Sequence, residues 1–140
     1  MSPKRVATVF FLLLAIALPR ASRAADGPLE TAAYAWLGLL DTERWADAWR
    51  EGGPLLRDGV TESEWIEATQ RVRENWGPIE SRTTVDKGYH TQIDGGPDGQ
   101  YFTLRIKTHF MNGGEKLEIV TLTATPPDQQ YRAVAYGIKR

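Results

Sequence analysis

The chain has 140 residues, no cysteine and a nearly balanced charge, with 17 basic and 18 acidic residues. A chain of this length corresponds to one ordinary domain and buries enough apolar surface to fold without cross-links. The lack of cysteine excludes a disulfide-framed toxin or growth-factor scaffold, and the lack of a basic run argues against a nucleic-acid partner.

The first 24 residues have the pattern of a secretory signal peptide. Two basic residues open this segment, and residues 6–18 are then apolar at every position but one. A helix needs about 20 apolar residues to span a bilayer, and this run is shorter. Ser22 and Ala24 are small, as the −3 and −1 positions of a cleavage site require. We therefore expect cleavage after Ala24 and a periplasmic or secreted location. The alternative is an uncleaved N-terminal anchor.

Cleavage after Ala24 leaves residues 25–140, which we predict to form a single domain. The leader contains four basic residues and no acidic one, so the mature chain keeps 13 basic and 18 acidic residues and has a net charge of −5. A mildly acidic surface repels both nucleic acid and anionic lipid. We therefore expect neither nucleic acid nor, after cleavage, a membrane as a partner.

The first mature segments have the apolar spacing of helices. Residues 29–40 place apolar side chains at three- and four-residue steps, which predicts a helix with one buried face. Asp41 and Thr42 interrupt the pattern before residues 45–49 resume it. This favours two helices that meet at Asp41, and a single kinked helix is the alternative. Residues 55–60 are predicted to be a link.

A third helix begins at a capping box. The Thr61 hydroxyl can accept from a free backbone N–H while Glu64 reaches back to the residue that caps the helix. Trp65, Thr69, Val72 and Trp76 are predicted to form its buried stripe, and the following Gly-Pro pair is predicted to end it. All five tryptophans of the chain fall on such stripes, which predicts that they pack in the core. Trp45 and Trp76, near helix ends, are the candidates for exposure.

The spacing of apolar residues changes to two after Pro78, which predicts strands. Residues 79–87 are rich in Thr and Val and form the first, whereas residues 89–96 lack a clear period and are a candidate broken piece. Residues 101–110 alternate without exception and form the clearest strand. Residues 115–125 and 131–138 complete a meander. The prediction is an α+β domain, with N-terminal helices packed on a curved antiparallel sheet of about four strands.

Short motifs follow one another in a recognisable order. In the helical half they are Ala35-Trp36-Leu37, Leu40-Asp41, Trp45, Trp49, Trp65, Trp76-Gly77-Pro78 and Ser81-Arg82. In the strand half they are Gly96-Pro97-Asp98-Gly99-Gln100-Tyr101, Thr108-His109-Phe110, Glu118 and the closing segment 131–136. This ordered set resembles the exported bacterial family called domain of unknown function four-zero-one-nine, over residues 30–138. The resemblance implies an exported domain of cystatin-like or nuclear-transport-factor-like shape, and it implies no established activity.

Residues that carry catalytic chemistry are sparse. His90 and His109 are the only histidines and lie too far apart in sequence to form a metal-binding motif, so we expect no metal and no cofactor. Cone-shaped folds of the nuclear-transport-factor type host acid–base enzymes, and by that analogy an enzyme is the alternative function. Its candidate residues are Asp41, Asp86, His90 and Asp94. Asp41 is more simply explained as a break between helices, and Asp94 as part of a turn.

Five side chains on the predicted strands are candidate ligand-binding residues. Arg82 and Glu118 are expected to form an ion pair across the concave face of the sheet, which is either structural or marks the mouth of a cavity. Arg105, Arg132 and Tyr136 are candidates for a pocket that takes an acidic or aromatic ligand, and a solvated sheet face is the alternative. We therefore predict a non-catalytic module that binds a small molecule or a protein.

Overall fold

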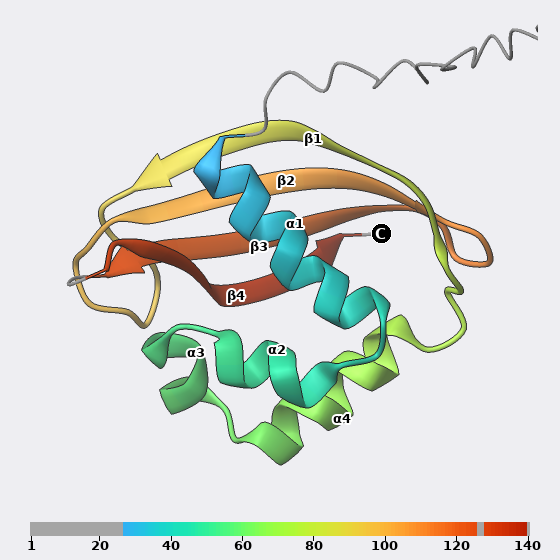
Figure 1. Cartoon of the computed structure of the whole chain (residues 1–140), viewed down its shortest axis with the longest axis horizontal. Coiled ribbons are helices and arrows are strands. Elements are labelled where there is room, and N and C mark those ends of the chain that lie inside the picture. The colour runs from blue at the N-terminus through green and yellow to red at the C-terminus, as the bar shows by residue number, and fades with distance from the viewer. Residues whose placement is uncertain (1–26, 126–127, 140) are drawn as a thin grey trace, which may run out of the picture.

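The computed structural model describes residues 27–125 and 128–139, so the predicted leader and its cleavage site lie outside the described residues. Four helices precede a four-stranded antiparallel sheet with strand order β1-β2-β3-β4, which confirms the predicted α+β class (Figure 1). No helix in this part of the chain is long and apolar enough to cross a membrane. The elements are α1 (Pro28–Asp41), α2 (Trp45–Glu51), α3 (Pro54–Gly59), α4 (Glu62–Arg73), β1 (Ile79–His90), β2 (Tyr101–Phe110), β3 (Gly114–Thr125) and β4 (Gln130–Lys139).

Helix α1 crosses one face of the curved sheet, and the other three helices lie along the β4 side (Figure 1). Its predicted apolar stripe is buried, with Ala33 and Leu37 fully inaccessible. The helix ends at Asp41, and α2 begins at Trp45, which confirms two helices rather than one kinked helix. Glu43 in the connection has a positive φ of 59°, a left-handed conformation that reverses the chain within a few residues.

The predicted link at residues 55–60 is wrong, because residues 54–59 form the short helix α3. Pro54 sets the backbone for the first helical turn, and Leu56 is buried in the core. The N–H of Gly53 donates to the carbonyl oxygen of Ala133 in β4 at 2.8 Å. A side chain at Gly53 would lie 2.9 Å from Val134, so the start of α3 fits directly against the sheet edge.

Helix α4 begins as predicted and ends earlier than predicted. The Thr61 hydroxyl accepts from the Glu64 N–H at 3.2 Å and the Glu64 carboxylate accepts from the Thr61 N–H at 3.1 Å, which confirms the capping box. The helix stops at Arg73, and Asn75 has a positive φ of 68°. Trp76 therefore lies beyond the helix, and Val72, which was predicted to be buried, is 44% exposed.

Tryptophan side chains join the helices to one another. The indole N–H groups of Trp36, Trp49 and Trp65 each donate at 2.9 Å to a backbone carbonyl of another helix or connection. Trp36 and Trp65 are buried in the core, as expected. Trp76 is half-buried and packs on Phe110 of β2, with ring centroids 4.9 Å apart. Trp36, Trp49 and Trp65 thus pack the helices together, with their indole N–H groups paired as partly or fully buried indoles require.

Strand β1 continues to His90, so the broken piece predicted at residues 89–96 does not exist. A register shift beside Val85 moves the residues that follow it to the opposite face, so residues 88–90 do not continue the pattern of residues 79–84. An extra residue in one strand interrupts the alternation of faces. Before the shift Arg82 points toward the helices, and after it Lys87 does so and pairs with Glu30 of α1. Strand β2 alternates as predicted from Leu104 to Phe110, where the even-numbered residues are buried. At its start the prediction is wrong, because Tyr101, expected on the solvent face, is buried and Phe102 is only half-buried.

Candidate functional site

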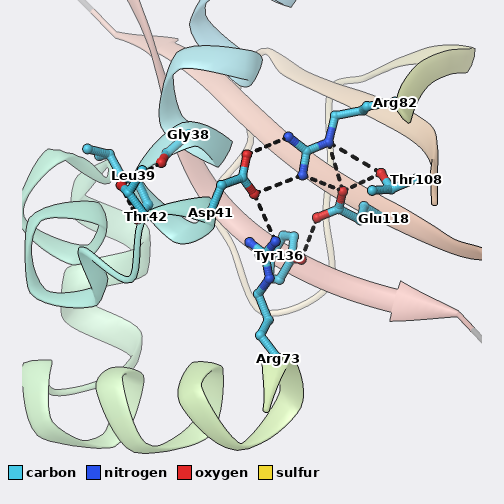
Figure 2. Close-up of polar contacts among 9 residues, drawn as sticks. All are labelled: Gly38, Leu39, Asp41, Thr42, Arg73, Arg82, Thr108, Glu118 and Tyr136. Carbon is cyan, nitrogen blue, oxygen red and sulfur yellow. Dashed lines mark hydrogen bonds and ion pairs between the residues drawn. The ribbon is translucent and has the colours of Figure 1, made fainter. Parts of the chain in front are cut away.

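A charged cluster lies between the helices and the sheet, and its members come from six different elements (Figure 2). Its sheet side is buried, and Asp41 at its helix side is exposed. Asp41 ends α1 and Arg73 ends α4, whereas the other four side chains point from the sheet toward the helices. The charged cluster consists of Asp41, Arg73, Arg82, Thr108, Glu118 and Tyr136.

Arg82 lies at the centre of the charged cluster. Its Nε and Nη2 donate to Glu118 Oε1 at 3.0 and 2.8 Å. Its Nη1 and Nη2 donate to the two carboxylate oxygens of Asp41 at 2.8 and 3.1 Å. Burial alone lowers the pKa of Arg82, but the hydrogen bonds and charges of Asp41 and Glu118 outweigh it and raise the pKa above its usual range. The guanidinium therefore remains charged and fixed.

Glu118 is completely buried, yet both of its oxygens have partners. Oε1 accepts from Arg82 and from the Thr108 hydroxyl, and Oε2 accepts from the Tyr136 hydroxyl at 2.6 Å. Burial and the negative charge of Glu118 both raise the pKa of Tyr136. The phenol therefore stays protonated and donates to the carboxylate. This satisfies the requirement that a buried charge be paired and hydrogen-bonded.

Arg73 completes the charged cluster from the end of α4. Its Nη2 donates to Asp41 Oδ1 at 2.8 Å, and its guanidinium lies 5.1 Å from the centre of the Phe110 ring. The side chain is only 6% exposed. Its Nη1 is buried and has no hydrogen-bond partner among the described residues. Nearly all buried polar groups in proteins are paired, so this free donor is the unusual feature of the charged cluster.

The charged cluster offers a donor rather than a base. Each oxygen of Asp41 and Glu118 already accepts at least one hydrogen bond from within the charged cluster, and Nη1 of Arg73 is left over. This arrangement suits a ligand with an accepting oxygen better than it suits proton abstraction. All four acid–base candidates, Asp41, Asp86, His90 and Asp94, are exposed.

A cleft of about 560 Å³ adjoins the charged cluster at Asp41 and Arg73. Its walls are the α1–α2 turn, the end of α4 with residues 74–78, and Asn112 in the β2–β3 turn. Three of the lining residues have a positive φ, namely Glu43 (59°), Asn75 (68°) and Gly77 (72°). A positive φ is ordinary for Gly77, but for non-glycine residues such as Glu43 and Asn75 it is uncommon and clusters at functional sites.

The β2–β3 turn holds the far wall of the cleft in place. The N–H groups of Asn112 and Gly113 donate to the carbonyl oxygen of Trp76 at 2.9 and 3.0 Å. A Cβ atom at Gly77 would lie 2.7 Å from the side chain of Asn112. Only glycine combines the left-handed backbone with this close approach, so the local sequence fixes the cleft wall.

Three of the five predicted ligand-binding residues come together, and two do not. Arg82, Glu118 and Tyr136 meet in the charged cluster. Arg105 lies on the opposite, exposed face of the sheet, because it alternates with the buried residues of β2. Arg132 pairs with Asp128 beside the β3–β4 turn at 2.8 Å. A register shift in the pairing of β3 with β4 separates Arg132 from Tyr136, so the two residues point to opposite faces.

Sequence reasoning missed the contributions of Arg73 and Thr108 and saw Asp41 chiefly as a helix break. Thr108 and Glu118 did carry a signal, because each is a polar residue within a run of buried apolar positions. Arg73 carried none, since a basic residue in the last turn of a helix is common. No group of three or more His, Cys, Asp or Glu in the described part of the chain could hold a metal ion.

Comparison with known proteins identifies a family, and that family has no described activity. A search of curated proteins found no match to the chain. A family model matches residues 32–136, a span that contains the whole charged cluster and all of the residues that line the cleft. Because this match covers most of the chain, the protein belongs to the family described as protein of unknown function (DUF4019).

Proposed function

We propose that this protein is an exported, non-catalytic binding domain and that the cleft beside the charged cluster holds a small ligand. The free donor of Arg73 carries the proposal. Its Nη1 is buried without a partner in a side chain that lines the cleft. A buried N–H that lacks a partner costs about 1–3 kcal/mol. Nη1 has almost no accessible surface in the ligand-free structure, so the lining must shift by a small amount before a ligand oxygen accepts from Nη1 and recovers this free energy.

Preorganisation of Arg73 supports the same proposal. Asp41 and the Phe110 ring fix the guanidinium of Arg73, and Arg82 in turn fixes Asp41. Glu118 then anchors Arg82 from the middle of the sheet. Binding to a group that is already oriented avoids the entropic cost of ordering it. The charged cluster thus holds the guanidinium of Arg73, a residue that lines the cleft, in one orientation.

The N-terminal segment supports the exported location. Its short apolar run after two basic residues, followed by Ser22 and Ala24, has the pattern of a cleaved leader. Expression of the full chain in a bacterium, with mass spectrometry of the protein in the periplasmic fraction, tests this. We expect a mature N-terminus at Ala25. Protein that keeps Met1, or that stays in the cytoplasm, would contradict the proposed location.

Two-dimensional NMR of the purified protein with a library of small polar metabolites tests binding in the cleft. We expect at least one compound to shift the amide signals of Thr42, Glu43 and Asn75. The exposed Gln70 lines the cleft, so Gln70→Trp should obstruct it and abolish these shifts. Glu67→Trp places the same bulk on α4 outside the cleft and should leave them unchanged. Compounds that shift none of these signals, or that bind Gln70→Trp equally well, would refute the proposal.

A further inference from the structure

We infer that the ligand of the cleft is a zwitterion, with a cationic group and an accepting carboxylate or carbonyl oxygen, as in a short peptide with a free amino end. This inference rests on the proposed function and names the class of ligand. Its basis is the charge distribution of the cleft. Arg73, Glu43 and Glu74 all line the cleft; Arg73 has a buried donor without a partner, and the two glutamates have carboxylates.

Neither Glu43 nor Glu74 has a side-chain hydrogen bond or ion pair with another described residue. The positive charge of Arg73, by contrast, is already matched by Asp41. The cleft therefore presents a local excess of negative charge beside one free N–H donor. A purely anionic ligand would satisfy Arg73 but approach two carboxylates of like charge. A ligand with one charge of each sign satisfies both sides.

The backbone fixes both carboxylates at the rim of the cleft. Glu43 sits in the tight α1–α2 turn, where its N–H donates to Leu40 at 3.2 Å and the next N–H, of Arg44, donates to Leu39 at 2.8 Å. The Thr42 hydroxyl donates to Gly38 at 2.8 Å and reinforces this turn (Figure 2). Glu74 caps α4, and its N–H donates to Gln70 at 2.9 Å. The two carboxylates therefore start from fixed backbone positions.

The remaining lining favours an amino group with a short polar chain. Trp45 is half-buried and contributes an aromatic ring, which attracts a cation over its face. The amide side chains of Gln70, Asn75 and Asn112 offer both donors and acceptors, as a peptide group requires. The cleft volume of about 560 Å³ falls within the range of about 300–1,000 Å³ that is usual for small-molecule sites.

Three dipeptide probes that differ only in their terminal charges test the inference. Glycylglycine carries both charges, N-acetylglycylglycine only the carboxylate, and glycylglycinamide only the ammonium. Each is titrated into the purified protein at neutral pH and constant ionic strength while the amide signals of Thr42, Glu43 and Asn75 are followed by NMR. Because an exposed ion pair contributes up to about 1 kcal/mol, we expect glycylglycine to bind about three- to fivefold more tightly than either analogue. Equal affinity of a singly charged analogue, or no shift with any probe, would overturn the inference.

A charge-neutral variant locates the cationic end of the ligand. Glu43→Gln combined with Glu74→Gln should weaken glycylglycine about three- to fivefold and should not weaken N-acetylglycylglycine. Glu51→Gln is the matched control, since Glu51 is an exposed carboxylate that does not line the cleft. Unchanged binding of glycylglycine by the double variant would overturn the inference. The metabolite screen with Gln70→Trp would still stand, which separates failure of the ligand class from failure of the proposed function.

Discussion

Arg82 and Glu118 form a buried ion pair that joins β1 to β3 across the intervening strand β2, with Nη2 and Oε1 2.8 Å apart. Glu118 is fully buried and the Arg82 side chain is only 10% exposed. Thr108 of β2 lies between them and bonds to both. Removing two charges from water is costly, and only good geometry with further hydrogen bonds offsets this cost. Asp41, Thr108 and Tyr136 supply those bonds here.

The first prediction concerns removal of the negative charge of Glu118 from this ion pair. Glu118→Gln leaves the buried guanidinium of Arg82 with Asp41 as its only charged partner. We expect the free energy of unfolding to fall by about 3–5 kcal/mol, as for other buried pairs that lose one partner. Glu115→Gln on the same strand is the control, because Glu115 is exposed and should change stability by less than about 0.5 kcal/mol. Urea unfolding measures both, and similar losses in the two variants would contradict a structural role for the pair.

The predictable part of the fold is where local chemistry and periodicity agree. The strict alternation of residues 101–110 and the capping box of Thr61 and Glu64 both correspond to the observed elements. Helix α3 and the full length of β1 were not predictable. The first depends on a contact between Gly53 and Ala133, which is distant in sequence. The second contains a bulge beside Val85, which removes the alternation that identifies a strand.

Only the residues that the sheet contributes to the candidate site could be predicted from the sequence. Glu118 and Arg82 stand out because charged residues within core-facing strand positions need partners. Arg73 does not stand out, since its sequence context is that of an ordinary C-terminal helix residue. Its role depends on how α4 is placed against α1, and that placement depends on the packing of Trp65 and Trp36. Sequence alone does not encode such a contact in any local pattern.

The second prediction concerns alkaline pH. Burial and the charge of Glu118 raise the pKa of Tyr136 above its unfolded value of about 10. The folded protein therefore holds this proton more tightly than the unfolded chain does. The associated stability is complete below about pH 10 and is lost as the pH rises further, toward the folded pKa.

Tyr136→Phe tests this pH dependence. The variant should lose stability at neutral pH, because Glu118 Oε2 loses its donor, and its stability should fall less steeply above about pH 10. Tyr89→Phe is the control, since Tyr89 is 55% exposed. Unfolding free energies across the alkaline range are the measurement. Equal slopes for wild type and Tyr136→Phe would contradict the coupling of Tyr136 to Glu118.

The third prediction concerns the contact between α3 and the sheet edge. A methyl group at Gly53 would lie 2.9 Å from Val134 Cγ1, so Gly53→Ala forces the helix away from β4. We expect a loss of about 1–3 kcal/mol in unfolding free energy, as for other overpacked positions. Gly59→Ala, at the other end of α3, meets no atom within 4 Å and should be neutral or slightly stabilising. Equal effects in urea unfolding would contradict the close packing of α3.

The last prediction tests whether Arg73 stabilises the fold or instead provides a hydrogen-bond donor for a ligand. Arg73→Met removes an ion pair with Asp41, but Asp41 keeps both hydrogen bonds from Arg82. The variant also removes the unpartnered N–H of Nη1, and the methionine side chain can still pack on Phe110. These effects oppose each other, so the net change should be within about 1.5 kcal/mol, well below that of Glu118→Gln.

The same Arg73→Met variant should no longer bind ligands in the cleft, because the buried donor that recognises them is gone. Urea unfolding and NMR titration with a compound from the metabolite screen measure the two properties separately. Loss of binding with small loss of stability is the expected combination. A loss of stability as large as that of Glu118→Gln would show that Arg73 serves chiefly to support the fold and would contradict this prediction.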